Sequence, residues 1–344
     1  MNPVALSHSQ EFHPDEVIDG RYRIIRKLAD GGMGTVFLGE HLLIKRRVAI
    51  KLLHADLAAD RGMVHRFMNE ASAAGTLGDP HIVESTDMGF TRGGLPYIVF
   101  EYLEGCLLAQ EIRRLGGLPV RRALLILRQV ASALDVAHNA QIAHLDLKSD
   151  NVYLTGRGDA LDHVKLFDFG ISRFMAFDAE TTQPGLLMGT PEFMAPEQVT
   201  SPDAVDCRAD IYALGVLLYE MLTGRCPFMS DDPSLVLHQV IHEPPPPLDR
   251  AVPLEVECLL FDGLLVKSRE RRLQTMGEVI TILDSLIAAM PPGVPDALST
   301  FDEPDPEPVH AITPFWEVES WFDDAPTLLE GALDEFPWDG DDWP

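Results

Sequence analysis

The chain has 344 residues, an apolar fraction of 46% and a formal net charge of −27, and it is long enough for two lobes around sizeable cores. Such an acidic surface repels nucleic-acid phosphates and anionic lipid, so neither is expected as a direct partner. No apolar run reaches the ~18–20 residues that a membrane span needs, and Met1 to Gln10 lack the basic and apolar regions of a signal peptide. Four widely spaced cysteines argue against a disulfide framework or a zinc site and are compatible with a cytoplasmic location: Cys106, Cys207, Cys226 and Cys258.

The N-terminal part predicts a glycine hairpin after a flexible lead-in. Residues 1–17 are polar and without periodicity, and a flexible segment is expected over 1–19. Two strand-like runs, residues 22–28 and 35–39, then flank the glycine-rich turn of residues 31–34. Such a turn can lie close to a ligand, although on its own it is equally consistent with a plain turn.

A third strand is expected over residues 47–53, with Lys51 in its apolar middle. A lysine there is costly unless its ammonium finds an anion or points to solvent from an edge strand. Residues 61–74 then show the periodicity of a helix, which carries Glu70. From the residues alone, Glu70 is either a surface glutamate or the partner of Lys51.

Further along, strands are expected over residues 81–84 and 97–103, and Glu104-Gly105 is a natural hinge between two lobes. Residues 119–140 form the clearest helical pattern in the chain, with Pro119 in the first turn. Three more helices are expected, over residues 210–222, 254–265 and 275–289, with a stiff polyproline link at 244–247.

Two loops carry the chemistry. The first, residues 144–151, holds Asp146, Lys148 and Asn151. The second, residues 166–170, places Asp168 beside a glycine at the end of a strand-like run. Carboxylate and amide oxygens at this spacing suit a magnesium-bound phosphate, and the lysine suits the phosphate itself.

In this order, the glycine turn, the V-A-I-K strand ending at Lys51 and the two loops resemble the motifs of bacterial-type Ser/Thr protein kinases. The resemblance covers residues 20–289. It implies an α+β, bilobal kinase fold, with a small antiparallel β lobe and one main helix over about 20–103 and a larger helical lobe over about 104–289. It also implies transfer of the ATP γ-phosphoryl group to Ser/Thr hydroxyls of protein substrates, with Mg2+, and autophosphorylation.

The resemblance assigns residues to ATP. Lys51 would hold the α- and β-phosphates and pair with Glu70, backbone groups at Glu101 and Leu103 would bind adenine, and Phe100 would stand behind the base. The expected ATP-binding residues are Leu28, Ala29, Asp30, Gly31, Gly32, Met33, Gly34, Val36, Ala49, Lys51, Glu70, Glu101 and Leu103. Ala29 departs from the family pattern, because it occupies the first glycine position of G-x-G-x-x-G-x-V.

The resemblance also assigns the transfer step. Asp146 would accept and orient the substrate hydroxyl, Lys148 would neutralise the transferring phosphoryl, and Asn151 and Asp168 would bind magnesium. Lys148 and Thr190 favour Ser/Thr over Tyr as the acceptor. An activation segment is expected between residues 171 and 195, with Thr181 and Thr182 as sites of phosphorylation. The resemblance gives three residues structural roles: Glu197 paired with Arg272, and Asp210 bonded to the catalytic-loop backbone.

One departure bears on regulation. Leu145 stands where the family has an arginine that receives the phosphate of a modified activation segment. We therefore expect that activity does not strictly require phosphorylation at Thr181 or Thr182. A pseudokinase scaffold, which does no catalysis, would have lost at least one of the six residues that carry the chemistry. All six are present here: Lys51, Glu70, Asp146, Lys148, Asn151 and Asp168.

Residues 290–344 form an acidic tail, expected to be disordered. From Pro291 it has fifteen Asp/Glu, no Lys or Arg, ten prolines and all four tryptophans. The alternation of acidic and aromatic residues suits docking onto a groove of a protein partner, and an inert solubilising tail is the alternative. A tail-driven adaptor, with the kinase fold as a platform, is compatible with catalysis.

Overall fold

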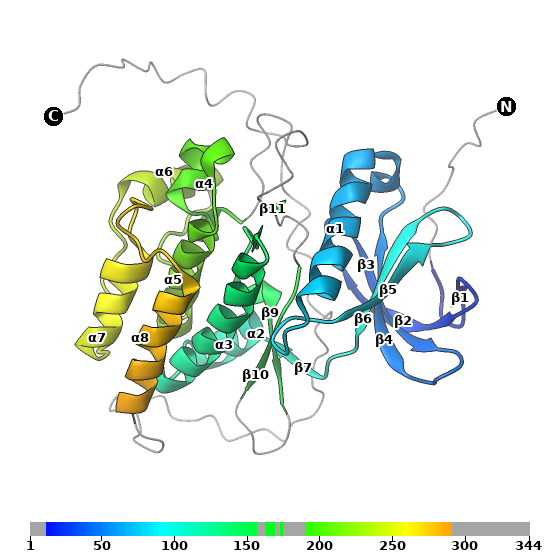
Figure 1. The fold of residues 1–344 in the computed structure, drawn as a ribbon, viewed down its shortest axis with the longest axis horizontal. Coiled ribbons are helices and arrows are strands. Elements are labelled where there is room, and N and C mark those ends of the chain that lie inside the picture. Colours follow the sequence, from blue (N-terminus) through cyan, green and yellow to red (C-terminus); the bar gives the residue numbers. More distant parts are fainter. Residues whose placement is uncertain (1–11, 157–161, 169–172, 175–189, 291–344) are drawn as a thin grey trace, which may run out of the picture.

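The computed structural model describes residues 12–156, 162–168, 173–174 and 190–290. Figure 1 shows two lobes side by side, a sheet-rich one and a helical one, joined where the chain passes from β6 to β7. The bilobal α+β arrangement expected from the sequence is confirmed. The acidic tail lies outside the described residues, and no helix within these residues is long and apolar enough to cross a membrane.

The small lobe is built on a six-stranded antiparallel sheet with strand order β1-β2-β3-β4-β6-β5. Its strands are β1 (Val17–Ile18), β2 (Tyr22–Asp30), β3 (Gly34–His41), β4 (Arg47–Leu53), β5 (Ser85–Phe90) and β6 (Pro96–Glu101). Lys51 lies opposite Val36 on one neighbouring strand and Ile98 on the other. It therefore belongs to a central strand, and the edge-strand alternative does not hold.

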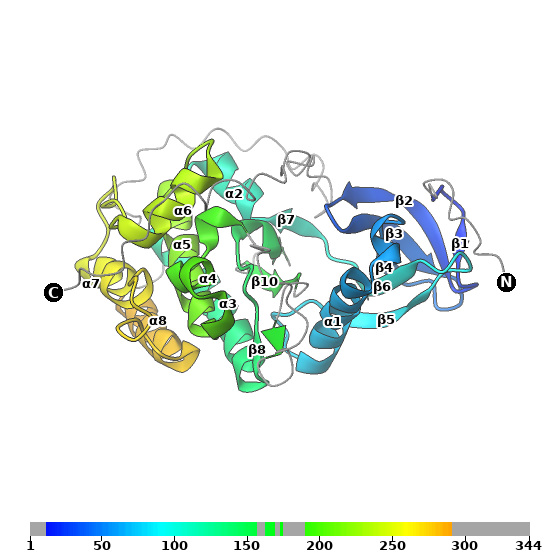
Figure 2. The same ribbon diagram turned by 90° about the horizontal axis from the view of Figure 1, so that it is seen from above.

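A single long helix, α1 (Arg61–Leu77), packs on this sheet, on the side that faces the helical lobe (Figures 1 and 2). It begins where the carboxylate of Asp60 accepts the amides of Gly62 and Met63, and it ends at Gly78, whose φ of +58° suits glycine. Phe67, one of its own residues, is fully buried. The helix runs three residues beyond the expected end at residue 74.

Two expectations for the small lobe were wrong. Residues 17–18 pair with β2, and the ring of Phe12 packs edge-on against Phe37, so the lead-in is ordered from Phe12 onwards. Residues 81–84 are not a strand: Ile82 makes only an isolated bridge to Leu166, and the strand is β5. This strand lies at the sheet edge with every second residue exposed, so it lacks the apolar run that would predict a strand from the sequence.

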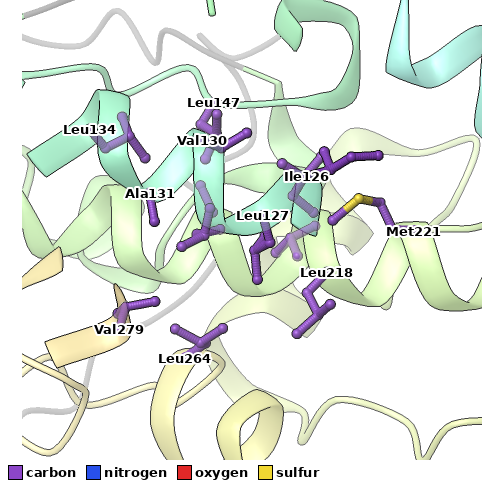
Figure 3. Close-up of a cluster of buried hydrophobic side chains, with 14 of the residues drawn as sticks. Ile126, Leu127, Val130, Ala131, Leu134, Leu147, Leu218, Met221, Leu264 and Val279 are labelled. Carbon is purple, nitrogen blue, oxygen red and sulfur yellow. The ribbon is translucent and has the colours of Figure 1, made fainter. Parts of the chain in front are cut away.

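The large lobe is organised around α3 and α5. Its helices are α2 (Leu108–Leu115), α3 (Val120–Asn139), α4 (Pro196–Thr200), α5 (Arg208–Thr223), α6 (Pro233–His242), α7 (Leu254–Cys258) and α8 (Met276–Ala289). Figure 3 shows Leu127 of α3 facing Leu218 of α5, with Leu264 and Val279 closing the cluster from below. Burial of this apolar surface is the main stabilising term of the lobe.

The chain differs from expectation at two helix ends in this lobe. Pro119 is the N-cap of α3, not part of its first turn. The helix expected over 254–265 changes character after Cys258 into a π-helical segment, η5 (Leu259–Leu264), where the amide of Leu265 donates to the carbonyl of Leu260. Thr275 caps α8 by accepting the amide of Glu278.

Short strands and turns position the two chemical loops. One small sheet has the order β10-β9-β7, from β7 (Gly105–Leu107), β9 (Val152–Thr155) and β10 (His163–Leu166). A second pairs β8 (Ile142–Ala143) with β11 (Arg173–Phe174). The remaining turns are η1 (Leu57–Ala59), η2 (Ser149–Asn151), η3 (Pro191–Phe193) and η4 (Pro202–Ala204). Residues 144–151 thus run between β8 and β9, and Asp168 follows β10.

Candidate active site

Lys51 meets two carboxylates between the lobes. Its Nζ lies 2.8 Å from both oxygens of Glu70 on α1 and 3.6 Å from Asp168. Burial by itself would lower the pKa of Lys51, but the carboxylates of Asp168 and Glu70 outweigh it, so the net pKa shift is upward and the ammonium stays charged. The structure therefore brings together residues from β4, α1 and the loop after β10, and holds a cation ready for an anionic ligand.

The glycine turn lies directly over the end of β4. The amide of Gly31 donates to the carbonyl of Gly34 at 3.0 Å, which closes the turn. A Cβ on Gly34 would stand 2.1 Å from the carbonyl oxygen of Leu52, so only glycine allows the two strands to approach this closely. Gly31 and Gly32 are exposed.

Apolar side chains on either side of the segment that joins the two lobes, between β6 and β7, form one cluster. Three of its buried members, Leu28, Ala49 and Leu103, are expected ATP-binding residues. Other buried members are Leu38, Phe100 and Tyr153. Ala29, Met33 and Val36 are partly buried against it. The arrangement offers an apolar wall for a flat base, as small-molecule sites usually do.

The contacts of Glu101, at the start of the segment that joins the lobes, limit how the adenine base of ATP could bind there. The carboxylate of Glu101 pairs with Lys165 at 2.6 Å, and the amide of Glu101 donates to the carbonyl of Glu84 at 3.0 Å. That amide is therefore not available to a ligand. An adenine at this position would have to use the carbonyl of Glu101 and the backbone of Leu103.

The loop between β8 and β9 brings the three residues expected to act in phosphoryl transfer together. All three are buried: Asp146 is 7% exposed, Lys148 8% and Asn151 3%. The Nδ2 group of Asn151 donates to the backbone carbonyl of Asp146 at 2.8 Å and lies 3.3 Å from Oδ2 of the same residue. Lys148 Nζ lies 3.2 Å from Asp146 Oδ2. Because these groups are fixed by one another, the Asp146 carboxylate is held in one orientation.

Thr190 joins this group from a distant part of the chain. Lys148 Nζ donates to Thr190 Oγ1 at 2.9 Å. The amide and the hydroxyl of Thr190 each donate to Asp146 Oδ1 at 3.3 Å. The two residues taken from the sequence as favouring Ser/Thr are therefore in direct contact with each other and with Asp146.

Asn151 and Asp168 fit a divalent metal. Asn151 uses its Nδ2 group within the protein, so its carboxamide oxygen is the atom left to act as a ligand. The amide of Phe167 donates to the backbone carbonyl of Asn151 at 3.2 Å, which ties the two loops together just before Asp168. A carboxylate and a carboxamide oxygen are hard donors of the kind that Mg2+ prefers. Asp168 adopts a φ of +65°, a left-handed conformation that is uncommon for aspartate and is often found at functional sites.

Asp210 anchors the base of the loop from within α5. Fully buried, it accepts the amides of His144 and Leu145 at 2.8 Å each, and it lies 2.7 Å from Nε2 of His138. Burial alone would raise the pKa of Asp210, but the contact with His138 and the amide of His144 outweigh it and hold the pKa below its ordinary value. Its contacts are those of a structural residue, as the sequence predicts.

A second buried ion pair holds the segment after Thr190. Arg272 reaches Glu197 with two parallel hydrogen bonds of 2.7 and 3.0 Å, and both residues are buried. The guanidinium also donates to the carbonyls of Val266 and Arg208 and lies over the ring of Tyr212. The pairing over 75 positions of sequence is the one that the family pattern predicts.

Some predicted residues lie outside the described part of the chain, namely Phe169, Gly170, Thr181 and Thr182. Others take part without having been predicted. His138 contacts Asp210, Gln198 donates to the carbonyl of Leu145 at 3.1 Å, and Ser149 donates to Glu220 at 3.0 Å. Each contact joins residues more than 50 positions apart, with no spacing or composition signal that could have indicated it.

A family profile described as "Protein kinase domain" matches residues 22–280. The chain belongs to the protein kinase family. The chain is 39% identical over 293 residues to the serine/threonine-protein kinase pkn2 of Myxococcus xanthus, a match that covers 82% of the chain and 35% of that protein. It is 41% identical over 258 residues to Pkn1 of the same organism, covering 73% of the chain and 36% of that protein.

The kinase PknB of Mycobacterium leprae (strain TN) is 36% identical over 291 residues, which cover 83% of the chain and 46% of that protein. The chain therefore spans less than half the length of each of these three relatives. The likeness concerns the kinase domain, which all three share with this protein.

Proposed function

We propose that this protein transfers the γ-phosphoryl group of ATP to serine or threonine hydroxyls of protein substrates. The observation that carries the proposal is the set of contacts around Asp146, where Lys148 and Thr190 approach from one side and Asn151 from the other. The names of the related kinases support the same activity.

Each residue of the group has a defined task. The carboxylate of Asp146 would accept the hydrogen bond of the incoming hydroxyl and orient its oxygen toward the phosphorus. Lys148, held against Asp146, would offset negative charge that builds up on the transferring group. Because the transition state of phosphoryl transfer is loose and highly anionic, positioning and charge neutralisation supply most of the catalysis.

The nucleotide would lie between the lobes, with its base against the apolar cluster of Leu28, Ala49 and Leu103 and its phosphates near Lys51. Family membership implies ATP and a divalent metal, and we propose magnesium held by Asn151 and Asp168. A bound metal ion would neutralise phosphate charge. Glu70 would keep the ammonium of Lys51 in place to receive the α- and β-phosphates.

The choice of Ser/Thr over Tyr rests on Lys148 and Thr190. The 2.9 Å contact between them supports this choice, because it holds the lysine next to Asp146, the residue proposed to orient the acceptor hydroxyl. We propose that the protein also phosphorylates itself.

The test uses the purified full chain with labelled ATP and magnesium, with the protein itself and a generic basic protein as acceptors. Wild type should transfer label to serine or threonine, Asp168→Asn should not, and Asp262→Asn, which alters an exposed acid of the large lobe, should behave as wild type. Near wild-type transfer by Asp168→Asn would contradict the proposed mechanism, and label on tyrosine alone would contradict the proposed acceptor.

Two further proposals concern the rest of the protein. We place it in the cytoplasm, which is supported by four cysteines that are all free. We propose that the tail docks a protein partner through the clusters Phe315-Trp316 and Trp321-Phe322. Fractionation of cells tests the first proposal. For the second, a Trp316→Ala/Trp321→Ala variant of the full chain should lose a partner that wild type retains.

A further inference from the structure

Three side chains meet beside the glycine turn, at the ends of three strands. Asp30 ends β2, Thr35 is the second residue of β3, and His54 directly follows β4. The hydroxyl of Thr35 donates to Asp30 Oδ1, and Nε2 of His54 lies 3.3 Å from both Asp30 Oδ1 and Thr35 Oγ1. Each of the three side chains therefore contacts the other two. We call this group the clasp.

The backbone adds a fourth contact. The amide of His54 donates to the carbonyl of Met33 at 3.0 Å, so His54 holds the turn through its main chain as well as through its ring. The other oxygen of Asp30 is paired with Lys27, which balances the charge of the carboxylate. The turn between Gly31 and Gly34 is thus tied at both ends to a point three residues beyond Lys51.

This placement matters because the turn and Lys51 would face the same phosphates. The glycine turn has no side chains that could fix its position at Gly31, Gly32 or Gly34. A free turn of this composition would spend part of its time away from a ligand, and holding it closed would reduce the entropy lost on binding.

We propose that Asp30, Thr35 and His54 are positioning residues that hold the glycine turn over the ATP phosphates, in register with Lys51. The proposal rests on the proposed kinase function, which it extends to three residues outside the transfer site. The clasp acts on the turn and does not touch the acceptor hydroxyl, so its loss should weaken ATP binding and spare the transfer step.

A purely structural role would give a different result. The side chain of Asp30 is 48% exposed and that of His54 33%, so their contacts contribute little to the stability of the lobe. Removing them should leave the unfolding temperature almost unchanged. A selective effect on ATP is therefore the expected mark of positioning.

The main comparison is Thr35→Val with Thr35→Ser, measured on the full chain with ATP, magnesium and a protein substrate. Valine keeps the shape of threonine and removes the hydroxyl, whereas serine keeps the hydroxyl. We expect Thr35→Val and His54→Ala each to raise the KM for ATP by about three- to tenfold, with kcat within about twofold of wild type. Thr35→Ser should restore a KM close to that of wild type.

Thr86→Val is the matched control. The hydroxyl of Thr86 also makes a hydrogen bond in the same sheet, to the carbonyl of Val99, but on the far edge strand β5. It should leave the KM for ATP unchanged. Unfolding temperatures of all these variants should lie within about 3 °C of wild type.

A double variant, Thr35→Val/His54→Ala, separates the clasp from a direct contact with phosphate. Residues that act as one unit should show non-additive effects, so the double variant should be little worse than either single one. An unchanged KM in both single variants, or an effect of Thr35→Val without one of His54→Ala, would overturn the proposal.

If wild type shows no transfer at all, the proposed function fails on its own. The clasp is then still tested by titrating magnesium-ATP into wild type and Thr35→Val in a calorimeter. Weaker binding by the variant supports the clasp, and equal binding refutes it.

Discussion

The carboxylate of Asp210 accepts the backbone amide of Leu145 at 2.8 Å, so the residue that departs from the family pattern is held by its main chain. Leu145 has a φ of +64°, which is unusual for leucine, and its carbonyl accepts a hydrogen bond from Gln198. Its side chain packs against the apolar core of the large lobe. The backbone arrangement of the loop therefore does not depend on an arginine at this position.

This relationship leads to the first prediction, a kinase that works without activation-segment phosphate. The leucine side chain cannot pair with a phosphate, so a Thr181→Ala/Thr182→Ala variant should keep at least about half of wild-type activity. Initial rates with an external protein substrate provide the measurement. A dead double variant would refute the idea, and Lys51→Met serves as the inactive reference.

The second prediction concerns Lys51 and Glu70. Glu70→Gln removes the charge that holds the ammonium at 2.8 Å and leaves Asp168, at 3.6 Å, as its remaining carboxylate within 4 Å in the described chain. The lysine should then shift toward Asp168, and kcat/KM for ATP should fall by about tenfold or more. Glu104→Gln, which alters an exposed acid on the crossing, should change it by less than about twofold. Equal rates for the two variants would show that the ion pair has no role in transfer.

The third prediction compares two ion pairs by burial. Arg272→Met leaves the buried carboxylate of Glu197 without its partner and should cost about 3–5 kcal/mol of the free energy of unfolding, or roughly 10 °C in Tm. Arg225→Met breaks the pair with Asp249, in which both side chains are more than half exposed, and should cost at most about 1 kcal/mol. Thermal unfolding at one pH and salt concentration checks both. Similar losses would mean that burial does not set the difference.

The fourth prediction is a pH dependence at Glu220. Burial raises the pKa of Glu220 to about 7, and Oε2 has no hydrogen-bond partner among the described residues. A carboxyl group whose pKa is higher in the folded protein stabilises the fold fully below its unfolded pKa of about 4.5, and this contribution is lost as the pH rises through 7.

A glutamine at position 220 keeps the contact with Ser149 and cannot ionise. Glu220→Gln should therefore be more stable than wild type at pH 8, by on the order of 3 kcal/mol, and similar to it at about pH 4. Chemical denaturation at the two pH values gives the comparison. A variant that is less stable than wild type at pH 8 would contradict the proposed cost of the buried charge.

The sequence was most informative where chemistry restricts the residue type. Lys51 in an apolar strand needed either an anion or solvent at a sheet edge, and Glu197 and Arg272 could be paired through the family pattern although they lie 75 positions apart. The long helix α3 was predicted because its apolar residues recur at helical spacing and are buried in the structure. Each of these features is marked in the sequence by a restricted residue type, a family motif or a clear periodicity.

Other features depend on tertiary contacts that leave little trace in local sequence. The edge strand β5 buries little on one face, so its sequence gives a weak signal. The short helices α2 and α6 were missed for another reason: each buries only two or three apolar residues at helical spacing, such as Leu108 and Ile112, over too short a run to stand out. His138 is one polar residue at the end of an apolar helix, and its contact with Asp210 arises only when α3 packs on α5. The residues of the clasp are short polar side chains at strand ends, which are common in any sheet.

The position of Asp210 has a consequence for heat inactivation. Its carboxylate belongs to the central helix of the large lobe and at the same time fixes two amides of the catalytic loop. The loop cannot keep its shape once α5 has melted, and α5 cannot release the loop without depriving a buried carboxylate of two hydrogen-bond donors. Loss of phosphoryl transfer and melting of the large lobe should therefore coincide on heating, as a single cooperative transition.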